Sequence, residues 1–363
     1  MDKKKIWIKA NGNGEVATGH IRRCMTIASE LIEHGVDVEF ILSDEYSANV
    51  LITLSDQENT VFDSRILHTL YSKPMGDIPV LKDMFQDEAP DFFLMDSPFV
   101  TPEYVQEINK LIENSGHRIG TGYIDDFNKN DYPVDLIINY DVAGPKDIYS
   151  AKIKLLGGQF APIRPKFGQA EYVINPRAKK VFLSAGGTDS NYVLGDILAE
   201  IYEADSPCRK VLDTKGLGCE VIVGALFDAD YKRHLQEMAD RHSSIRLHSG
   251  VGDDMADIMR ECDFAVSAGG ATLYELCAVG VPTVIFSVND SQAEFAKGFD
   301  MAGAAKYAGD ARDDHRLVQK IVTWGTAAVD NPGFRSRMSK KAKEIVDGKG
   351  TEKIADAILN LLI

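Results

Sequence analysis

The sequence predicts an α/β protein of two Rossmann-like domains, each with a parallel sheet, facing a central cleft. Strand-like apolar runs alternate with helical patterns over most of the chain, which is typical of parallel sheets with crossover helices. This alternation stops at an irregular segment with several Pro and Gly residues, 151–178, and then restarts. The length of 363 residues also favours two domains, since a compact domain usually holds about 100–200 residues.

The first half begins with the apolar run KIWIKA and a glycine loop that leads into a helix over 20–34. Further strands are expected in VDVEFIL, DFFLMD, HRIGTGYIDD and VDLIINY. A less regular region with an acidic helix near 80–88 separates the first two of these. Because residues 151–178 show no clean period, they are interpreted as a linker. We therefore expect an N-terminal domain over residues 1–168.

The second half repeats the pattern. Strands are expected in AKKVFLSAGG, CEVIVGAL, SIRLHSG, CDFAVSAGG and VPTVIFSV. Helices are expected in SNYVLGDILAEIY and near 228–241, 253–261, 271–279 and 291–303. The final segments, 334–346 and 350–363, read as closing amphipathic helices. We therefore expect a C-terminal domain over residues 169–363, whose last helices could pack back on the first domain.

Composition and charge exclude some classes of function. Apolar residues make up 44% and charged residues 26% of the chain, as in ordinary globular proteins. The net charge of −15 argues against a nucleic-acid partner, because phosphate backbones favour a basic surface. We expect no membrane span and no signal peptide, since no apolar run is long enough. The oligomeric state is left open.

The cysteines and histidines indicate a reduced protein without a metal. The five cysteines are scattered and form no C-x-x-C pair, which favours a cytoplasmic location. The histidines lack Cys or His partners at ligand spacing. Asp228-Ala-Asp230 has the D-x-D form of some metal-dependent transferases, but it opens a predicted helix, where solvated charges are the simpler explanation. We expect neither a metal nor a cofactor.

The loop NGNGEVATG, 11–19, is the first candidate site. Gly14 and Gly19 have P-loop spacing, but His20 and Ile21 stand where Lys and Ser or Thr would bind phosphate. Ligands of open α/β sheets bind beyond the carboxyl ends of the strands, so His20 is expected on the cleft side. The helix dipole favours a neutral imidazole there, as a general base requires. Helix capping, or packing under the loop, is the alternative. The glycine spacing also disfavours NAD.

The segment SAGGATLYELCAVGVPTVIF, 267–286, is the second candidate. Gly269 and Gly270 allow backbone N–H groups to approach an anion, and the start of the helix near Thr272 attracts it. Glu275 would lie one turn further on, where a carboxylate can accept hydrogen bonds from the two hydroxyls of a ribose. A plain turn followed by a solvated glutamate is the alternative.

Weaker candidates also follow predicted strands. In FLSAGGTDS, 182–190, a phosphate contact and an ordinary tight turn remain equally open, and Thr188 or Asp189 could cap the next helix. Asp96, Asp125 and Asp126 could hold sugar hydroxyls or form a catalytic pair. Capping of the following helices is the equally open alternative for each.

Three segments resemble one family, and a fourth resembles the wider glycosyltransferase B superfamily. ATGHIRRCMTIASEL resembles the G-x-G-H-x-x-R loop and helix of UDP-2,4-diacetamido-2,4,6-trideoxy-β-L-altropyranose hydrolases, the nucleotide-removing enzymes of pseudaminic acid biosynthesis. LLGGQFAPIRPKF and FLSAGGTDSNYV resemble the same family's inter-domain stretch and second glycine loop. The segment 267–286, with NDSQAEFA, resembles the nucleotide-sugar half shared with the peptidoglycan N-acetylglucosaminyltransferase. Related sequences occur in spore-coat polysaccharide gene sets.

The resemblance runs from about residue 5 to about residue 310 and implies a GT-B fold. It implies metal-independent hydrolysis of a UDP-linked amino-deoxy sugar at the anomeric C–O bond, releasing UDP and free sugar with inversion. His20 matches the catalytic histidine that deprotonates water. Candidate nucleotide- and phosphate-binding residues are Gly19, Gly187, Thr188, Val251, Gly269, Gly270, Ala271, Thr272 and Glu275. Candidate sugar-binding residues are Asn13, Asp96, Asp126 and Gln292.

Three departures from the family pattern fall on the sugar side. The loop NGNGEV lacks an Asp, Ala17 replaces a glycine, and Ser97-Pro98 replaces an aromatic or His pair. They leave the sugar open. Two alternatives also stay open: a glycosyltransferase with a UDP-sugar donor on the same fold, and a non-catalytic nucleotide-sugar binding protein.

Overall fold

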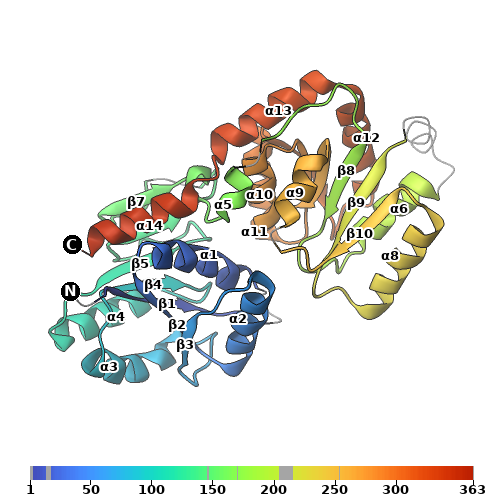
Figure 1. Cartoon of the computed structure of the whole chain (residues 1–363). Helices are drawn as coiled ribbons and strands as arrows, with labels where there is room; N and C mark the ends of the chain where they lie inside the picture. Colours follow the sequence, from blue (N-terminus) through green and yellow to red (C-terminus); the bar gives the residue numbers. More distant parts are fainter. Residues whose placement is uncertain are drawn as a thin grey trace. The chain divides into compact units, whose positions relative to one another are not determined.

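A computed structural model describes residues 3–13, 18–144, 147–169, 171–203, 216–252 and 254–362. Gly14 and Ala17 lie outside the described residues. The chain forms two compact units, one of Met1–Arg164 with Lys349–Ile363 and one of Pro165–Gly348 (Figure 1). The chain therefore passes from the first unit to the second after Arg164, a few residues before the expected boundary at 168. The last helix, α14 (Gly350–Leu361), packs on α1 (Gly19–Glu33) within the first unit.

The first unit is built on a seven-stranded sheet in the order β3-β2-β1-β4-β5-β6-β7, and every recorded pair is parallel. Its strands are β1 Lys5–Ala10, β2 Asp37–Leu42, β3 Asp63–Ile66, β4 Phe92–Asp96, β5 Gly120–Ile124, β6 Leu136–Asn139 and β7 Ile153–Leu156. The interpretation of residues 151–178 as a linker is thus wrong near its start, because β7 lies there and pairs with β6. The short run IKLL was missed because glycines follow it directly.

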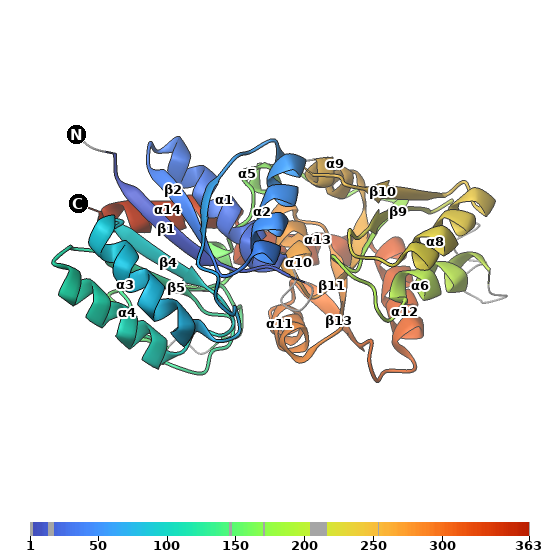
Figure 2. The same cartoon turned by 90° about the horizontal axis from the view of Figure 1, so that it is seen from below.

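Alternating residues of β1 feed two cores. Ile6 and Ile8 pack with residues of α1, α2 (Glu45–Glu58) and α14, whereas Trp7 packs on the opposite face. That second face is covered by α3 (Ile78–Asp87) and α4 (Pro102–Ser115), which lie side by side (Figure 1, Figure 2). Two short 3-10 turns, Pro74–Asp77 and Gly158–Phe160, complete the unit.

The second unit has a six-stranded parallel sheet in the order β10-β9-β8-β11-β12-β13. Its strands are β8 Lys180–Ser184, β9 Gly218–Val223, β10 Ile245–Ser249, β11 Phe264–Ala268, β12 Thr283–Ser287 and β13 Ala305–Asp310. Its helices are α5 Pro165–Gly168, α6 Val193–Tyr202, α8 Ala229–Arg241, α9 Asp254–Glu261, α10 Ala271–Val279, α11 Asp290–Met301, α12 Leu317–Asp330 and α13 Pro332–Ile345.

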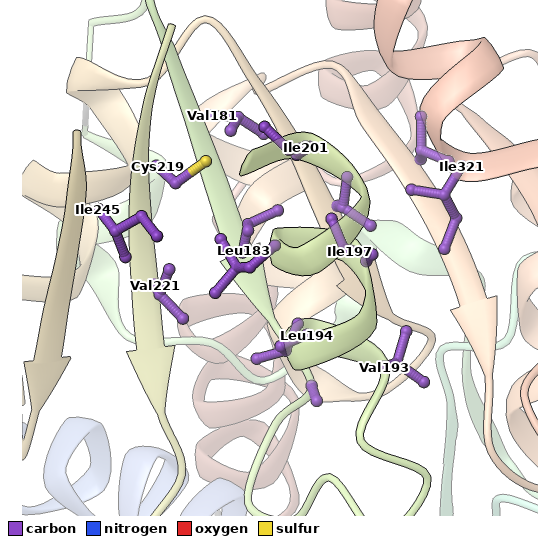
Figure 3. Packing of buried hydrophobic residues seen from close by; sticks show 14 of the residues in the cluster. Val181, Leu183, Val193, Leu194, Ile197, Ile201, Cys219, Val221, Ile245 and Ile321 are labelled. Atoms are coloured by element: carbon purple, nitrogen blue, oxygen red, sulfur yellow. The ribbon is translucent and has the colours of Figure 1, made fainter. Parts of the chain in front are cut away.

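The core of the second unit forms where α6 covers its sheet. Leu194 and Ile197 of α6 lie over Leu183 of β8 and Val221 of β9, and Ile321 of α12 closes the other side (Figure 3). Along this face α6 lies between α8 and α12 (Figure 2). In both units loops follow the carboxyl ends of the parallel strands. At this edge of each sheet we therefore look for the polar side chains of a binding site.

Candidate functional site

The candidate site of the first unit lies where β4 ends and α1 begins. β4 is the central strand of the sheet and pairs with β1, and the register sets Asp96 beside Ala10. His20 stands in the first turn of α1, which follows β1. The Nδ1 atom of His20 lies 2.7 Å from Oδ1 of Asp96. The histidine side chain is 15% exposed and the aspartate side chain is fully buried. The His20 ring therefore contacts a buried carboxylate at the sheet edge.

Arg23 joins this pair to a second acid. It lies three residues after His20, on the same face of α1. Its Nε donates to Oδ2 of Asp96 at 2.6 Å, and a second nitrogen donates to Oδ1 of the same carboxylate. Two further N–H groups donate to the two oxygens of Asp126, each at 2.8 Å. The hydroxyl of Tyr140 also contacts the guanidinium. One largely buried guanidinium thus bonds two carboxylates.

The ionisation of Asp96 fixes the proton on His20. Burial alone raises the pKa of the Asp96 carboxyl, but Arg23 and His20 outweigh it and hold this pKa below the ordinary value. Since an ionised carboxylate only accepts hydrogen bonds, Nδ1 of His20 carries the hydrogen. The 3.0 Å approach of Arg23 to Nδ1 is then a contact between two donors rather than a hydrogen bond. The other ring nitrogen, Nε2, is left as an acceptor, which is the state of a general base.

Asp96 has no lone pair left for a sugar. It accepts from His20, twice from Arg23 and from the Cys24 thiol at 3.3 Å. A carboxylate offers about four acceptor positions. The structure therefore favours a role for Asp96 in orienting His20 over the direct sugar contact expected from the sequence.

One atom each from His20, Asp96 and Asp126 lie within 4.8 Å of one another, a spacing that metal ligands also show. Arg23, however, already bonds both carboxylates. A divalent cation there would face the guanidinium at close range and compete with it for the same oxygens. The donor set thus fits a guanidinium better than a metal.

Other acids of the sequence analysis serve as caps and turns. Asp125 is buried and accepts from the Phe127 N–H and the Tyr149 hydroxyl. Asp228 caps α8 by accepting from the Tyr231 N–H at 2.8 Å, which confirms the simpler explanation of the D-x-D pattern. Asp189 accepts from the first N–H groups of α6, as expected for a capping residue.

The candidate site of the second unit lies where β11 ends and α10 begins. The N-cap of α10 is Gly270, which has no side chain that could cap the helix. A Cβ atom on Gly269 would lie 3.0 Å from the backbone oxygen of Gln292, so a glycine permits this close approach. The same atom on Gly270 would lie 3.7 Å from Nε2 of Gln292. The structure thus brings Gly269, Gly270 and Gln292 together, next to Ala271 and Thr272 in the first turn.

The remaining expected residues follow strands or begin helices at the carboxyl edges of the two sheets. Val251 follows β10 between two glycines of positive φ, Gly250 and Gly252, and its carbonyl accepts from the Asp254 N–H. Gly187 follows β8, and its carbonyl accepts from the Leu226 N–H. Thr188 comes next in this turn, and Glu275 lies half-buried within α10. In the first unit, Asn13 follows β1 and Gly19 begins α1.

Sequence reasoning missed the polar network around Asp96. Arg23 was part of the quoted motif but received no role, although its spacing from His20 places both on one helix face. Tyr140 directly follows β6, and Cys24 is buried in α1. The pairing of Arg23 with Asp126 depends on the register of the sheet, which cannot be predicted from the sequence pattern.

Comparisons with known proteins agree with this architecture. A profile of the glycosyltransferase family 28 C-terminal domain matches residues 232–358. The crystal structure of Acinetobacter baumannii MurG covers 98% of this chain and 99% of its own, with a TM-score of 0.64 and 15% identity. Two parallel-sheet α/β units of this kind define the GT-B fold, and this protein has that fold, as expected.

Two curated proteins with names from surface-polysaccharide and nucleotide-sugar pathways are similar to this chain at low sequence identity. The spore coat polysaccharide biosynthesis protein SpsG of Bacillus subtilis is 24% identical over 56% of this chain and 58% of its own length. The Helicobacter pylori pseudaminic acid cytidylyltransferase and UDP-2,4-diacetamido-2,4,6-trideoxy-β-L-altropyranose hydrolase is 22% identical over 84% of this chain and 49% of its own length. The chain thus spans about half the length of each. Among the described residues, no helix combines the length and hydrophobicity needed to cross a membrane.

Proposed function

We propose that the protein hydrolyses a UDP-linked amino-deoxy sugar at the anomeric C–O bond and releases UDP and the free sugar without a metal ion. The observation that carries this proposal is the His20–Asp96 pair, whose 2.7 Å contact at Nδ1 leaves Nε2 as the acceptor of the ring. The similarity to the Helicobacter pylori protein, whose name includes a nucleotide-sugar hydrolase, supports it.

In this mechanism His20 takes a proton from water as the water oxygen bonds to the anomeric carbon. The bond from that carbon to the leaving phosphate oxygen breaks, and its electron pair leaves with UDP. Because attack and departure occur on opposite faces, the configuration inverts. Asp96 stabilises the imidazolium that forms. This role follows from its ionised state beside Nδ1.

The second unit would bind the nucleotide. Cleavage builds negative charge on the diphosphate, which aimed backbone donors stabilise without a metal. The start of α10, where the N-cap residue is a glycine, would offer such donors at Ala271 and Thr272. We assign the ribose hydroxyls to Glu275, the uracil to the backbone of Val251, and further phosphate or sugar contacts to the other candidates, Gly19, Gly187, Thr188, Gly269, Gly270, Asn13 and Gln292.

The reaction predicts a specific isotope result. In ¹⁸O-labelled water without an acceptor, the protein should release UDP from a UDP-linked acetamido sugar and place the label on the sugar. Mass spectrometry of both products checks this outcome. Label in UDP would mean cleavage at phosphorus and would refute the mechanism.

The ribose assignment predicts a second result. Glu275→Gln should weaken UDP binding by about tenfold to a hundredfold, because hydrogen bonds to a charged acceptor are worth about 1.5–3 kcal/mol. Calorimetry with UDP and its 2′-deoxy analogue tests this, since the wild type should prefer UDP and the variant should not. Glu294→Gln, an exposed residue of α11, is the control. An unchanged preference in Glu275→Gln would contradict the assignment.

A glycosyltransferase with a UDP-sugar donor is the second candidate. The profile match to the family 28 glycosyltransferase C-terminal domain favours it. His20 would then take the proton from an acceptor hydroxyl instead of water. UDP release that requires an added sugar or lipid acceptor would select this function, and tight binding without any turnover would select a binding protein.

A further inference from the structure

The groups around His20 form a cluster, and its net charge follows from the ionisation of each member. Arg23 contributes one positive charge, and Asp96 and Asp126 contribute two negative charges. Burial raises the pKa of the Tyr140 phenol and of the Cys24 thiol, so both stay neutral. With a neutral imidazole the cluster therefore carries −1, and it becomes neutral when His20 takes a proton.

Asp126 is the charged member of this cluster that is bonded to Arg23 rather than to the Asp96–His20 pair. Both of its oxygens accept from Arg23, each at 2.8 Å. Its side chain is 23% exposed, and one of its oxygens lies within 4.8 Å of a ring nitrogen of His20. Its charge therefore reaches the imidazole at short range, through Arg23 and through space.

The position of Arg23 creates a conflict that Asp126 relieves. Arg23 holds Asp96 with two hydrogen bonds, but its guanidinium also lies 3.0 Å from Nδ1 of His20. A lone cation at that distance would oppose the positive charge that a general base must accept. Without Asp126, the cluster would go from neutral to +1 on taking a proton, in surroundings of low exposure where an uncompensated charge is costly.

We propose that Asp126 is a positioning residue that balances the charge of Arg23 so that His20 can accept a proton, rather than a ligand of the sugar. The proposal rests on the proposed function, in which His20 is the base. Among the described residues, Asp96 from β4, Arg23 from α1 and Asp126 after β5 lie near the imidazole. Cys24 of α1 bonds Asp96, and Tyr140 after β6 contacts Arg23.

The test is the isosteric variant Asp126→Asn. It keeps one acceptor for Arg23 but removes the charge. We expect kcat to fall by about tenfold to a hundredfold, with KM for the UDP-sugar within about twofold of the wild type. Because the base becomes weaker, the acid side of the pH profile of kcat should move to lower pH. Asp126→Glu, which restores the charge, should recover most of the activity.

A neighbouring ion pair supplies the matched control. Arg22, next to Arg23 on α1, bonds Glu58 at 3.0 Å. Glu58→Gln removes a comparable charge from α2, where Glu58 pairs with the arginine next to Arg23, and should leave kcat, KM and the pH profile unchanged. A raised KM with unchanged kcat in Asp126→Asn would instead identify Asp126 as a sugar ligand. An equal loss in Asp126→Asn and Asp126→Glu, with no shift of the profile, would identify a purely structural role. Both outcomes overturn the proposal.

A measurement that does not depend on catalysis tests this inference separately from the proposed function. The titration of the His20 ring, followed by NMR, should have a lower midpoint in Asp126→Asn than in the wild type and in Glu58→Gln. If His20→Ala keeps its turnover, the proposed function fails while this titration still tests the charge balance. If His20→Ala is inactive and the titration is the same in all three proteins, only the charge balance fails.

Discussion

Replacing His20 by alanine should lower kcat by at least about 10²–10⁴-fold, the usual contribution of a general base. The substitution removes Nε2, the acceptor that the tautomer leaves free, and nothing else within the described network can take its place. Arg23 is a permanent cation, and Asp96 is buried with its acceptor positions filled. UDP binding should stay nearly intact, because the proposed nucleotide contacts other than Gly19 lie in the second unit. Steady-state kinetics and calorimetry with UDP check both parts.

Two variants make this result specific. His20→Asn keeps a donor for Asp96 but has no base, so it should be as inactive as His20→Ala while folding like the wild type. His34→Ala changes the histidine at the other end of the same helix and should be fully active. Turnover by His20→Asn at more than a tenth of the wild-type rate would exclude His20 as the base.

Much of the fold could be predicted because its strands are short apolar runs separated by helices of regular period. β1, β4, β8 and β11 fall within the predicted segments, and α1 (Gly19–Glu33) differs by one residue at each end from the helix predicted over 20–34. β13 was missed because its sequence, AKYAGD, mixes polar residues with a glycine, and the pairing of β12 with β13 shifts register near Phe286. A strand at the edge of a sheet is less buried than a central strand and needs fewer apolar residues. Its hydrophobic pattern in the sequence is therefore weaker.

The candidate site was predictable in its location but not in its internal bonds. Parallel strands end at one edge, so His20 and Asp96 were expected on the same side of the first sheet. Their 2.7 Å contact, however, depends on the register that sets Asp96 beside Ala10. The register of β4 with β5, which sets Met95 beside Tyr123, places Asp126 where Arg23 can bond it. The two acids that were expected to contact the sugar therefore belong to a charged network. The glycine loop before α10 was easier to predict, since its own sequence specifies the turn.

Asp96→Asn should lower kcat by about 10²–10⁴-fold although Asp96 does not contact substrate. An amide offers one acceptor oxygen, and Arg23 requires it. The amide NH₂ then faces Nδ1 of His20, which must become an acceptor, so the ring proton moves to Nε2 and the base is lost. The expected pattern is a fall in kcat with little change in KM. NMR of the ring nitrogens should show the proton on Nε2 in the variant and on Nδ1 in the wild type.

The same substitution should change how stability depends on pH. Because the pKa of folded Asp96 lies below its ordinary value of 3.8, the ionised group stabilises the fold at neutral pH. This stabilisation is lost as the pH falls below 3.8 toward the folded-state pKa, so the gap in unfolding free energy between wild type and Asp96→Asn should narrow on acidification. Asp125→Asn alters a buried carboxylate without a bond to His20 and should leave the ring tautomer unchanged. An Asp96→Asn protein with wild-type kcat would show that the buried carboxylate does not set the proton on His20.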